Sequence, residues 1–259
     1  MTADVAIEPA GRFPSTIKPF TAMIAMVKFL INKEDTSQVF RVFDAIDGPQ
    51  TERNFRRFEK LPEGKRIIER EIDLAPILRD RERLSRLPAN TLGGAYYAFT
   101  HAEGLDADGL VYAEQAANVR TLQVEPARRR FISSGFQLHD IWHVLGGYGR
   151  DAVGEACVLA FSYGQLDIIG MDIFAKMMAV KEKLYYPKAP VFACLKEARD
   201  MGRKAEWLVA QDWDALLEQD LREVRFKLRV STPTLYNQYK DLFSETDARR
   251  REKMLKAAA

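Results

Sequence analysis

Residues 126–169 decide the fold, and they read PARRRFISSGFQLHDIWHVLGGYGRDAVGEACVLAFSYGQLDII. Pro126 suits the first turn of a helix, and apolar residues recur after it at helical spacing. The glycine-rich turn at residues 146–149 ends this helix, and Asp151 can cap the next one. We therefore predict two consecutive helices, from Pro126 to about Leu145 and over residues 152–169, with the chain reversing direction between them.

The other apolar residues also recur at helical spacing, and no Asn-Gly or Asp-Gly turn separates alternating runs as hairpins require. The sequence predicts an all-α protein with a single multi-helix domain over residues 19–243. An N-terminal arm (residues 1–18) precedes it, and a charged C-terminal tail (residues 244–259), which we expect to fray, follows it. Further helices are predicted over residues 20–31, from Thr36 to a break at residues 47–49, over residues 53–60 and 65–72, and as one helix whose apolar stripe runs from Trp213 to Leu228.

The composition excludes several classes of protein. The chain has 259 residues, of which 47% are hydrophobic, so it can bury a substantial core. Its 39 basic and 37 acidic residues leave a formal charge of only +2, so we expect no nucleic-acid partner. Cys157 and Cys194 form no Cys-x-x-Cys pair, which excludes a thiolate zinc site and indicates a reducing compartment.

Two features of the sequence bear on membranes and targeting. No apolar stretch reaches the roughly 18 residues that a membrane span needs. Residues 1–16 carry two acidic residues and one arginine, unlike the Arg-rich, acid-poor composition of a mitochondrial presequence. We expect a bacterial cytoplasmic protein or a mature organellar one.

Two of the three histidines, His139 and His143, are four residues apart, which places them on one face of the predicted helix. By chance, such a pair would arise in only about 2% of chains with three histidines. On their own, these histidines could simply face water. His101 has no partner at a useful spacing, and we interpret it as structural. The opposite side of the helix is an apolar seam, formed by Leu138, Ile141, Trp142 and Leu145.

Glu155 favours a metal site over a solvated polar face. It is the only charged residue between Asp151 and Asp167, so we expect it to be at least partly buried, and a buried carboxylate needs a cation, a metal or several donors. Because the turn reverses the chain, Glu155 can meet His139 and His143 across a helical hairpin. Two imidazoles and a carboxylate commonly bind a divalent metal.

Asp140 also belongs to this candidate site. It lies about 100° around the helix from His139, and it can act as a fourth ligand. Alternatively, it can accept an imidazole N–H and so fix which nitrogen faces the metal. The predicted metal-binding and catalytic residues are therefore His139, Asp140, His143 and Glu155.

The pattern His139-Asp140-x-x-His143, eleven residues and then Glu155 resembles that of the ubiquinone (coenzyme Q) biosynthesis protein 4 family. The similarity covers roughly residues 20–230 and extends to segments around Thr91 and Trp213. The chain departs from the family pattern at two places. The residues before His139 read SSGFQL, where the family usually has an Arg-rich, Glu-containing sequence, and Asn90 stands where the family often has glycine.

The resemblance implies a largely helical fold, a bound divalent metal usually described as zinc, and oxidative decarboxylation of a polyprenylated hydroxybenzoate, in which a hydroxyl replaces the carboxyl at ring carbon 1. It also implies association with other quinone-biosynthesis proteins at a membrane surface. That surface would be the inner face of the bacterial inner membrane, or the matrix side of the mitochondrial one. The ligand set does not exclude iron.

Two other functions stay open. One is a non-catalytic scaffold that binds prenyl lipid and organises the other enzymes, with a structural metal in the hairpin. The other, weaker one is a metal-dependent hydrolase that uses bound water.

Several further segments are candidates for contacts with lipid, substrate or a second copy. A prenyl tail needs an apolar groove, for which residues 20–31, 156–164 and 168–178 offer surface. The basic residues between Arg53 and Arg70 could rest on an anionic membrane. Arg128, Arg129 and Arg130 could hold a carboxylate, although such triplets are more often solvated. The apolar helix at residues 20–31 could also form a homodimer.

Overall fold

The computed structural model describes residues 11–31, 35, 37–104, 112, 115–119 and 123–258. Throughout these ranges the regular structure is helical, and the one β-type pairing is an isolated bridge between Thr91 and Asp220. The predicted all-α class is therefore confirmed. None of the described helices is both long enough and apolar enough to span a membrane. The helical domain divides into two compact units, while the predicted domain limits at residues 19 and 243 stay a prediction.

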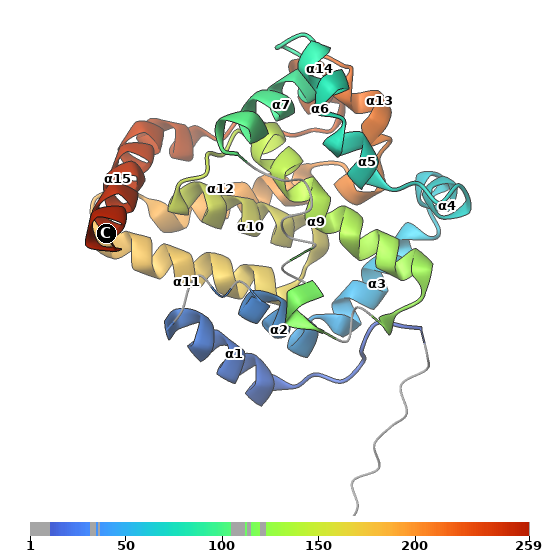
Figure 1. Cartoon of the computed structure of the whole chain (residues 1–259), viewed down its shortest axis with the longest axis horizontal. Coiled ribbons are helices and arrows are strands. Elements are labelled where there is room, and N and C mark those ends of the chain that lie inside the picture. Colours follow the sequence, from blue (N-terminus) through green and yellow to red (C-terminus); the bar gives the residue numbers. More distant parts are fainter. Residues whose placement is uncertain are drawn as a thin grey trace, which may run out of the picture. The chain divides into compact units, whose positions relative to one another are not determined.

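The first unit comprises Met1–Asp80, Leu105–Leu138 and Val209–Gln211. Its helices are α1 (Pro19–Ile31), α2 (Ser37–Ile46), α3 (Gly48–Phe58), α4 (Pro62–Glu69), α5 (Leu74–Arg79) and the first part of α9 (Pro126–Gly146). Helices α1 and α2 pack side by side (Figure 1). The core includes the edge-to-face ring pairs Phe40–Phe136 and Phe55–Phe131.

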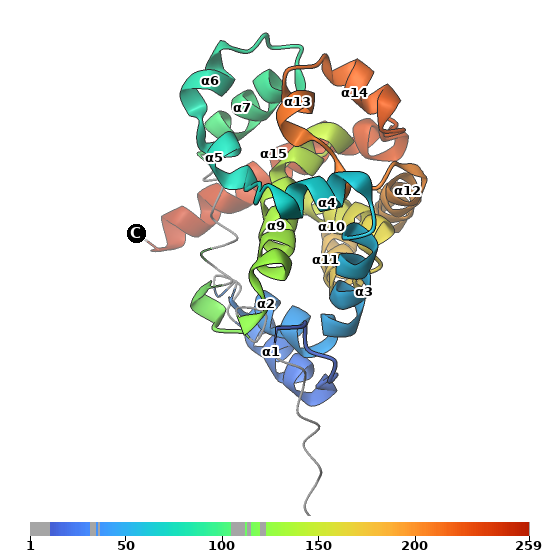
Figure 2. The same cartoon turned by 90° about the vertical axis from the view of Figure 1, so that its right-hand side faces the viewer.

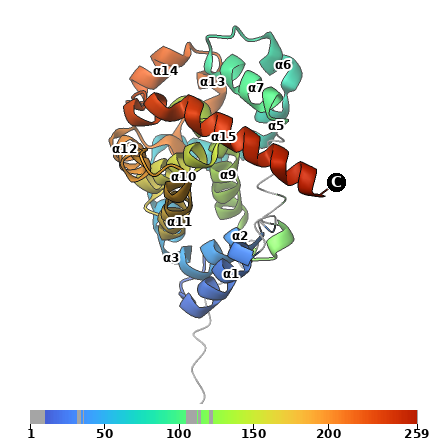
Figure 3. The same cartoon turned by 90° about the vertical axis from the view of Figure 1, so that its left-hand side faces the viewer.

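The second unit comprises Arg81–Gly104, His139–Leu208 and Asp212–Ala259. Its helices are α6 (Arg81–Arg86), α7 (Leu92–Ala102), the end of α9, α10 (Ala152–Leu166), α11 (Ile169–Tyr185), α12 (Val191–Lys204), α13 (Trp213–Leu217), α14 (Leu221–Lys227) and α15 (Thr234–Ala258). The 3-10 turn η2 (Leu208–Ala210) has its first residue in this unit and the other two in the first unit. Helices α10, α11 and α12 pack on one another (Figure 2), and α15 crosses over α10 and α12 (Figure 3).

Two glycines bring the backbones of α10 and α12 unusually close. A Cβ atom added to Gly164 would lie 2.3 Å from the carbonyl oxygen of Arg199, and one added to Gly202 would lie 2.2 Å from that of Phe161. Any side chain at either position would therefore push the helices apart. This close approach fixes the position of α10, the helix that carries Glu155.

The predicted helices are largely present. The helix at residues 20–31 is α1, and Pro126 begins α9, which ends one residue beyond the predicted Leu145. Asp151 caps α10 as predicted, by accepting hydrogen bonds from the amides of Val153 and Gly154. Helix α10 ends at Leu166, three residues before the predicted end, because Asp167 adopts a left-handed conformation with φ of 54°. The predicted cap Thr36 lies outside the described residues.

The prediction of one helix from Trp213 to Leu228 is wrong. The chain forms two short helices there, α13 and α14, which are separated at residues 218–220. The Asp220 carboxylate caps α14, while the backbones of Gln219 and Leu221 are hydrogen-bonded to those of Leu92 and Asn90. These tertiary hydrogen bonds interrupt the helix, although the apolar stripe remains buried as predicted.

The charged C-terminal segment is helical, where we expected a frayed end. It forms the second half of α15, and the Arg250 guanidinium lies 2.7 Å from Glu182 of α11 and 3.6 Å above the centre of the Tyr185 ring. Because Glu182 is buried, this ion pair attaches the segment to the second unit.

Arg128 is buried in the first unit and supports its structure. Its guanidinium donates hydrogen bonds to both carboxylate oxygens of Glu52, at 2.7 and 2.8 Å, pairs with Glu125 and stacks 4.3 Å from the ring centre of Phe55. Burial alone would raise the pKa of Glu52, but hydrogen bonds from Arg128 and Arg56 lower the pKa of this carboxyl to about 2. We had expected a solvated arginine at this position.

Replacing Arg128 with Met should lower the free energy of unfolding at pH 7 by about 1 to 3 kcal/mol, because the partly buried Glu52 carboxylate would lose its main partner and keep Arg56. The pKa of Glu52 is below its ordinary value in the folded protein, so its stabilising effect is present above about pH 4.5 and is lost as the pH falls toward 2. Urea denaturation should therefore show the difference between the two proteins shrinking over that range. The control, Arg53→Met, changes an exposed side chain and should have little effect. A similar loss in both variants would contradict this assignment.

Candidate metal centre

The candidate site lies in the second unit, where the end of α9 meets the start of α10. The half-buried Arg225 side chain donates hydrogen bonds of 2.9 Å to the carbonyl oxygens of Val144 and Leu145 and so stabilises the end of α9. At the start of α10, a Cβ atom on Gly154 would lie 2.1 Å from the carbonyl oxygen of Gly149, so this position requires glycine. The turn is therefore tight, and it brings Glu155 close to the histidines.

The side chains of His139, His143 and Glu155 converge on one point. The Nε2 atoms of the two imidazoles are 3.2 Å apart, and each lies 3.3 Å from the same Glu155 oxygen, Oε2. His143 is fully buried, whereas the side chains of His139 and Glu155 retain 20% and 22% of their exposure. The predicted convergence of these residues across the turn is therefore present in the structure.

The surroundings of His143 fix how its ring can act. Its Nδ1 atom lies 3.3 Å from the carbonyl oxygen of Tyr148, and a carbonyl only accepts hydrogen bonds. Nδ1 therefore carries the proton in either state, so Nε2 donates a hydrogen bond to Glu155 in the protonated ring and presents its lone pair to the site in the neutral ring. The Phe99 ring stacks on His143 at a centroid distance of 5.3 Å and covers it with an apolar surface.

Glu155 is held as a carboxylate. Its second oxygen, Oε1, lies 2.8 Å from Arg150 Nε. Burial alone would raise the pKa of Glu155, but the hydrogen bonds and charge of His139 and His143 hold it well below its usual range. Burial would likewise lower the pKa of His139, but the hydrogen bond to Glu155 and the charges of Glu155 and Asp140 leave it raised.

The three atoms have the geometry of a metal ligand set. A zinc ion with ligand distances of about 2.0 to 2.1 Å and tetrahedral angles keeps its ligand atoms about 3.3 Å apart. The three observed separations of 3.2 to 3.3 Å match this value. Two nitrogens and one carboxylate oxygen also match the donors that zinc accepts, and within the described residues no other group of His, Cys, Asp and Glu side chains forms such a cluster.

The structure does not bring Asp140 into this group of donor atoms. Its carboxylate is close enough for its charge to raise the pKa of His139, so its effect on the site is electrostatic. His101 lies at the exposed end of α7, stacked on Tyr97 and beside Arg81, in agreement with a structural role. Arg128 and Arg130 form ion pairs within the first unit.

The sequence analysis missed several residues that support the site. Arg150 occupies the turn, where no periodicity marks a partner for Glu155. Tyr236 lies far along the chain, and its hydroxyl donates a hydrogen bond to Asp151 and accepts one of 2.9 Å from the Gly149 amide. The spacing of charges within residues 126–169 could have suggested Arg150, whereas no local signal identifies Tyr236.

The fold and the site together define a class: an all-α protein in which a mostly buried His–His–Glu cluster is suited to a divalent metal. Residues 15–234 match the model of the family described as coenzyme Q (ubiquinone) biosynthesis protein Coq4. The chain belongs to this family, which indicates involvement in ubiquinone biosynthesis and confirms the resemblance found in the sequence.

Individual relatives agree with the family match. The chain is 27% identical over 170 residues, 66% of its length, to the mitochondrial ubiquinone biosynthesis protein COQ4 of Lachancea thermotolerans, and 26% identical over 203 residues, 75% of its length, to that of Pyrenophora tritici-repentis. These matches cover 50% and 64% of the relatives, so the chain spans about half the length of the first curated relative and somewhat more of the second.

A solved structure supports the fold. It is the crystal structure of a protein from Nostoc punctiforme whose name assigns it to ubiquinone biosynthesis. It superimposes with a TM-score of 0.62 at 23% identity, over 84% of this chain and 100% of the other. At this identity the similarity shows a shared fold.

Protein purified without added metal or chelator should contain about one equivalent of a divalent ion, measured by mass spectrometry of the elements. His143→Ala and Glu155→Gln should each lose it, because each removes a donor atom. Asp140→Asn and the matched control His101→Ala should keep it. Affinity should increase with pH, because the ion must displace the proton that the raised pKa of His139 retains. Loss of the ion in His101→Ala, or no uptake by the wild type on titration, would contradict this assignment.

Tyr236→Phe should lower the free energy of unfolding by about 1 to 3 kcal/mol, since the buried Asp151 carboxylate and the Gly149 amide each lose a partner. Chemical denaturation would measure the loss. Tyr239→Phe is the matched control, because the Tyr239 ring stacks on Phe243 and no hydrogen bond of its hydroxyl is found among the described residues. Its effect should stay within about 0.5 kcal/mol. An equal loss in the two variants would show that the Tyr236 hydroxyl contributes nothing specific.

Proposed function

We propose that this protein is a metal-dependent enzyme of ubiquinone biosynthesis that carries out the oxidative decarboxylation of a polyprenylated hydroxybenzoate, replacing the carboxyl at ring carbon 1 with a hydroxyl. The observation that carries the proposal is the convergence of His139 Nε2, His143 Nε2 and Glu155 Oε2 within 3.3 Å of one another. Family membership indicates ubiquinone biosynthesis. We take the substrate class from the polyprenylated aromatic intermediates of that pathway.

A bound zinc ion would supply a Lewis acid that stabilises negative charge on a substrate oxygen as CO2 leaves. His139, His143 and Glu155 are the residues that would hold it. Arg150 pairs with the Oε1 atom of Glu155 and leaves Oε2 facing the imidazoles, and the Tyr148 carbonyl keeps the Nε2 lone pair of His143 available. Phe99 excludes water from one face of the His143 ring.

The overall change also needs an oxidant. The aromatic acid and one water give the phenol and CO2 with release of two protons and two electrons. The side chains of this site accept no electrons, and zinc does not change its oxidation state. A separate two-electron acceptor therefore belongs to the proposal, and a native iron ion in the same ligand set would be the alternative way to supply redox chemistry.

The proposal includes a setting at a membrane surface, with other quinone-biosynthesis proteins as partners, because a polyprenylated substrate resides in lipid. In the second unit, α11 exposes Ile169, Ile173, Val180 and Leu184 along its length. These side chains provide an apolar surface for a prenyl tail or a partner helix.

His143→Ala and Glu155→Gln should abolish conversion of a polyprenylated hydroxybenzoate, because each removes a metal ligand. His101→Ala, a matched loss of an exposed histidine, should keep wild-type turnover. Mass spectrometry of the hydroxylated product and capture of CO2 would measure the reaction in the presence of an electron acceptor, and circular dichroism would check that each variant remains helical.

Full turnover by a variant that contains no metal would contradict the proposal. Failure of the metal-loaded wild type to convert substrate with any acceptor, together with a sharply lower melting temperature of His143→Ala, would instead favour the non-catalytic scaffold.

A further inference from the structure

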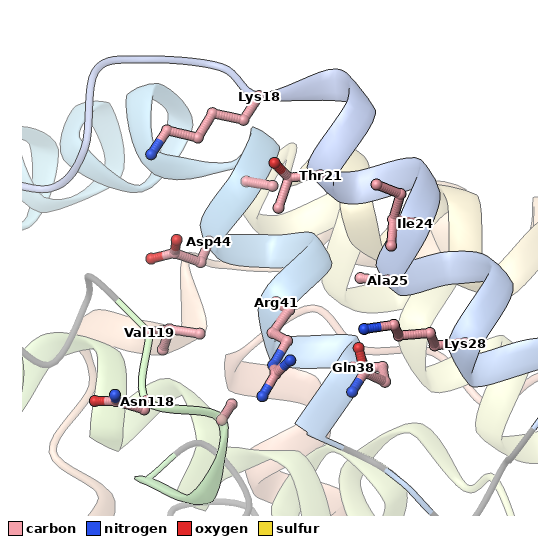
Figure 4. Close-up of a pocket in the computed structure, with 12 residues that line it drawn as sticks. Lys18, Thr21, Ile24, Ala25, Lys28, Gln38, Arg41, Asp44, Asn118 and Val119 are labelled. Carbon is pink, nitrogen blue, oxygen red and sulfur yellow. The ribbon is translucent and has the colours of Figure 1, made fainter. Parts of the chain in front are cut away.

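A cavity of about 420 Å³ in the first unit lies between α1 and α2 and is unrelated to the metal centre. Three cationic side chains line it, Lys18 just before α1, Lys28 from α1 and Arg41 from α2, together with one carboxylate, Asp44. The formal charge of its lining is therefore +2. Figure 4 shows the side chain of Lys28 extending toward Arg41 and Gln38. Among the described residues none of the three cations has an ion-pair partner within 4 Å, and only Arg41 acts on a further carboxylate, Asp35, whose pKa its charge helps to lower.

Besides these charged groups, the cavity lining includes Gln38, whose side-chain oxygen lacks a hydrogen-bond donor in the described part of the chain. Its side chain is only 4% exposed and lines the cavity. Its Nε2 donates a hydrogen bond of 2.8 Å to the Asp35 carboxylate, which only accepts, so the orientation of the amide is fixed. The other atom, Oε1, is buried and has no hydrogen-bond partner among the described residues. A buried acceptor without a partner is unfavourable, and a ligand hydroxyl would satisfy it.

The outer surface of α1 next to the cavity is apolar. Phe20, Met23, Ile24 and Val27 form a stripe at helical spacing, and each is between 50% and 77% exposed. Ile24 also lines the cavity, so the stripe and the cationic lining are continuous. Lys18 and Lys28 lie at the two ends of the stripe. An exposed apolar stripe of this kind, next to a charged lining, indicates a ligand with both hydrocarbon and anionic groups.

We propose that this cavity binds the headgroup of an anionic phospholipid of the phosphoglycerol type, with the α1 stripe against the hydrocarbon of the bilayer. The phosphate pairs with Lys28 and Arg41, a glycerol hydroxyl donates to Gln38 Oε1, and Lys18, at the other end of the stripe, meets a second headgroup of the same anionic surface. A second copy of the chain fits less well, because pairing two such stripes would also bring together the lysines that flank them. The proposal assigns membrane contact to α1 and α2 and does not depend on the reaction at the metal centre.

Vesicle flotation of the full chain tests the site. Binding should be strong to phosphatidylcholine vesicles that contain about a third phosphatidylglycerol and weak to phosphatidylcholine alone. A cation near an anionic membrane strengthens binding about fivefold, so the variant Lys18→Gln/Lys28→Gln/Arg41→Gln should bind at least tenfold more weakly. The matched control is Arg53→Gln/Lys60→Gln/Lys65→Gln, which removes the same charge from the basic segment between Arg53 and Arg70 and should stay within twofold of the wild type.

Two further measurements distinguish a bilayer lipid from a free phosphate ester, and a membrane from a second copy of the chain. Phe20→Ser/Met23→Ser should weaken vesicle binding without changing the mass of the protein in solution by light scattering. Glycerol 3-phosphate at millimolar concentration should neither bind with comparable affinity nor release the protein from vesicles. Equal loss of binding in the two triple variants would overturn the proposal. So would tight binding of free glycerol 3-phosphate, or a change from dimer to monomer in the Phe20→Ser/Met23→Ser variant.

Discussion

The buried carboxylate of Asp151 accepts hydrogen bonds from the first turn of α10 and from the hydroxyl of Tyr236, and the position of Glu155 depends on this arrangement. Burial raises the pKa of Asp151, so its hydrogen bonds offset a desolvation penalty as well as capping a helix. Tyr236 belongs to α15, and its hydroxyl also accepts a hydrogen bond from the Gly149 amide. The cap therefore joins the turn between α9 and α10 to a distant part of the chain. The three candidate metal ligands are thus positioned by residues that lie outside their cluster.

Arginine–glutamate pairs connect distant segments in both units. Arg128 reaches Glu52 in the first unit, and Arg250 reaches the buried Glu182 in the second. Arg150 and Glu155 form a similar pair, but only one oxygen of Glu155 is used by the arginine. The other oxygen remains directed at the two imidazoles. The ion pair with Arg150 therefore occupies one carboxylate oxygen of Glu155, and the other oxygen could bind a metal ion.

Local patterns predicted most of the helices, and of the four candidate site residues three converge in the structure. His139 and His143 are found by spacing because an α-helix stacks residues four apart, and Glu155 is found because a lone charge in an apolar helix needs a partner. Asp140 has the right chemistry but lies too far around α9 to join the other three. The break between α13 and α14 and the burial of Arg128 depend on partners distant in the sequence, Leu92 and Asn90 in one case and Glu52 in the other. No periodicity reveals such partners.

The close approach of Gly164 and Gly202 bears on the kinetics of metal exchange. Because α10 is locked against α12, the backbone that carries Glu155 has little freedom to withdraw. His143 is enclosed by Phe99 and by its own helix, whereas the ring of His139 keeps a partly open edge. An ion held by these residues would therefore enter and leave past the partly exposed side chains of His139 and Glu155, and rotation of those side chains would set the rate of exchange. Slow exchange would follow from side-chain rotamers, without any opening of the fold.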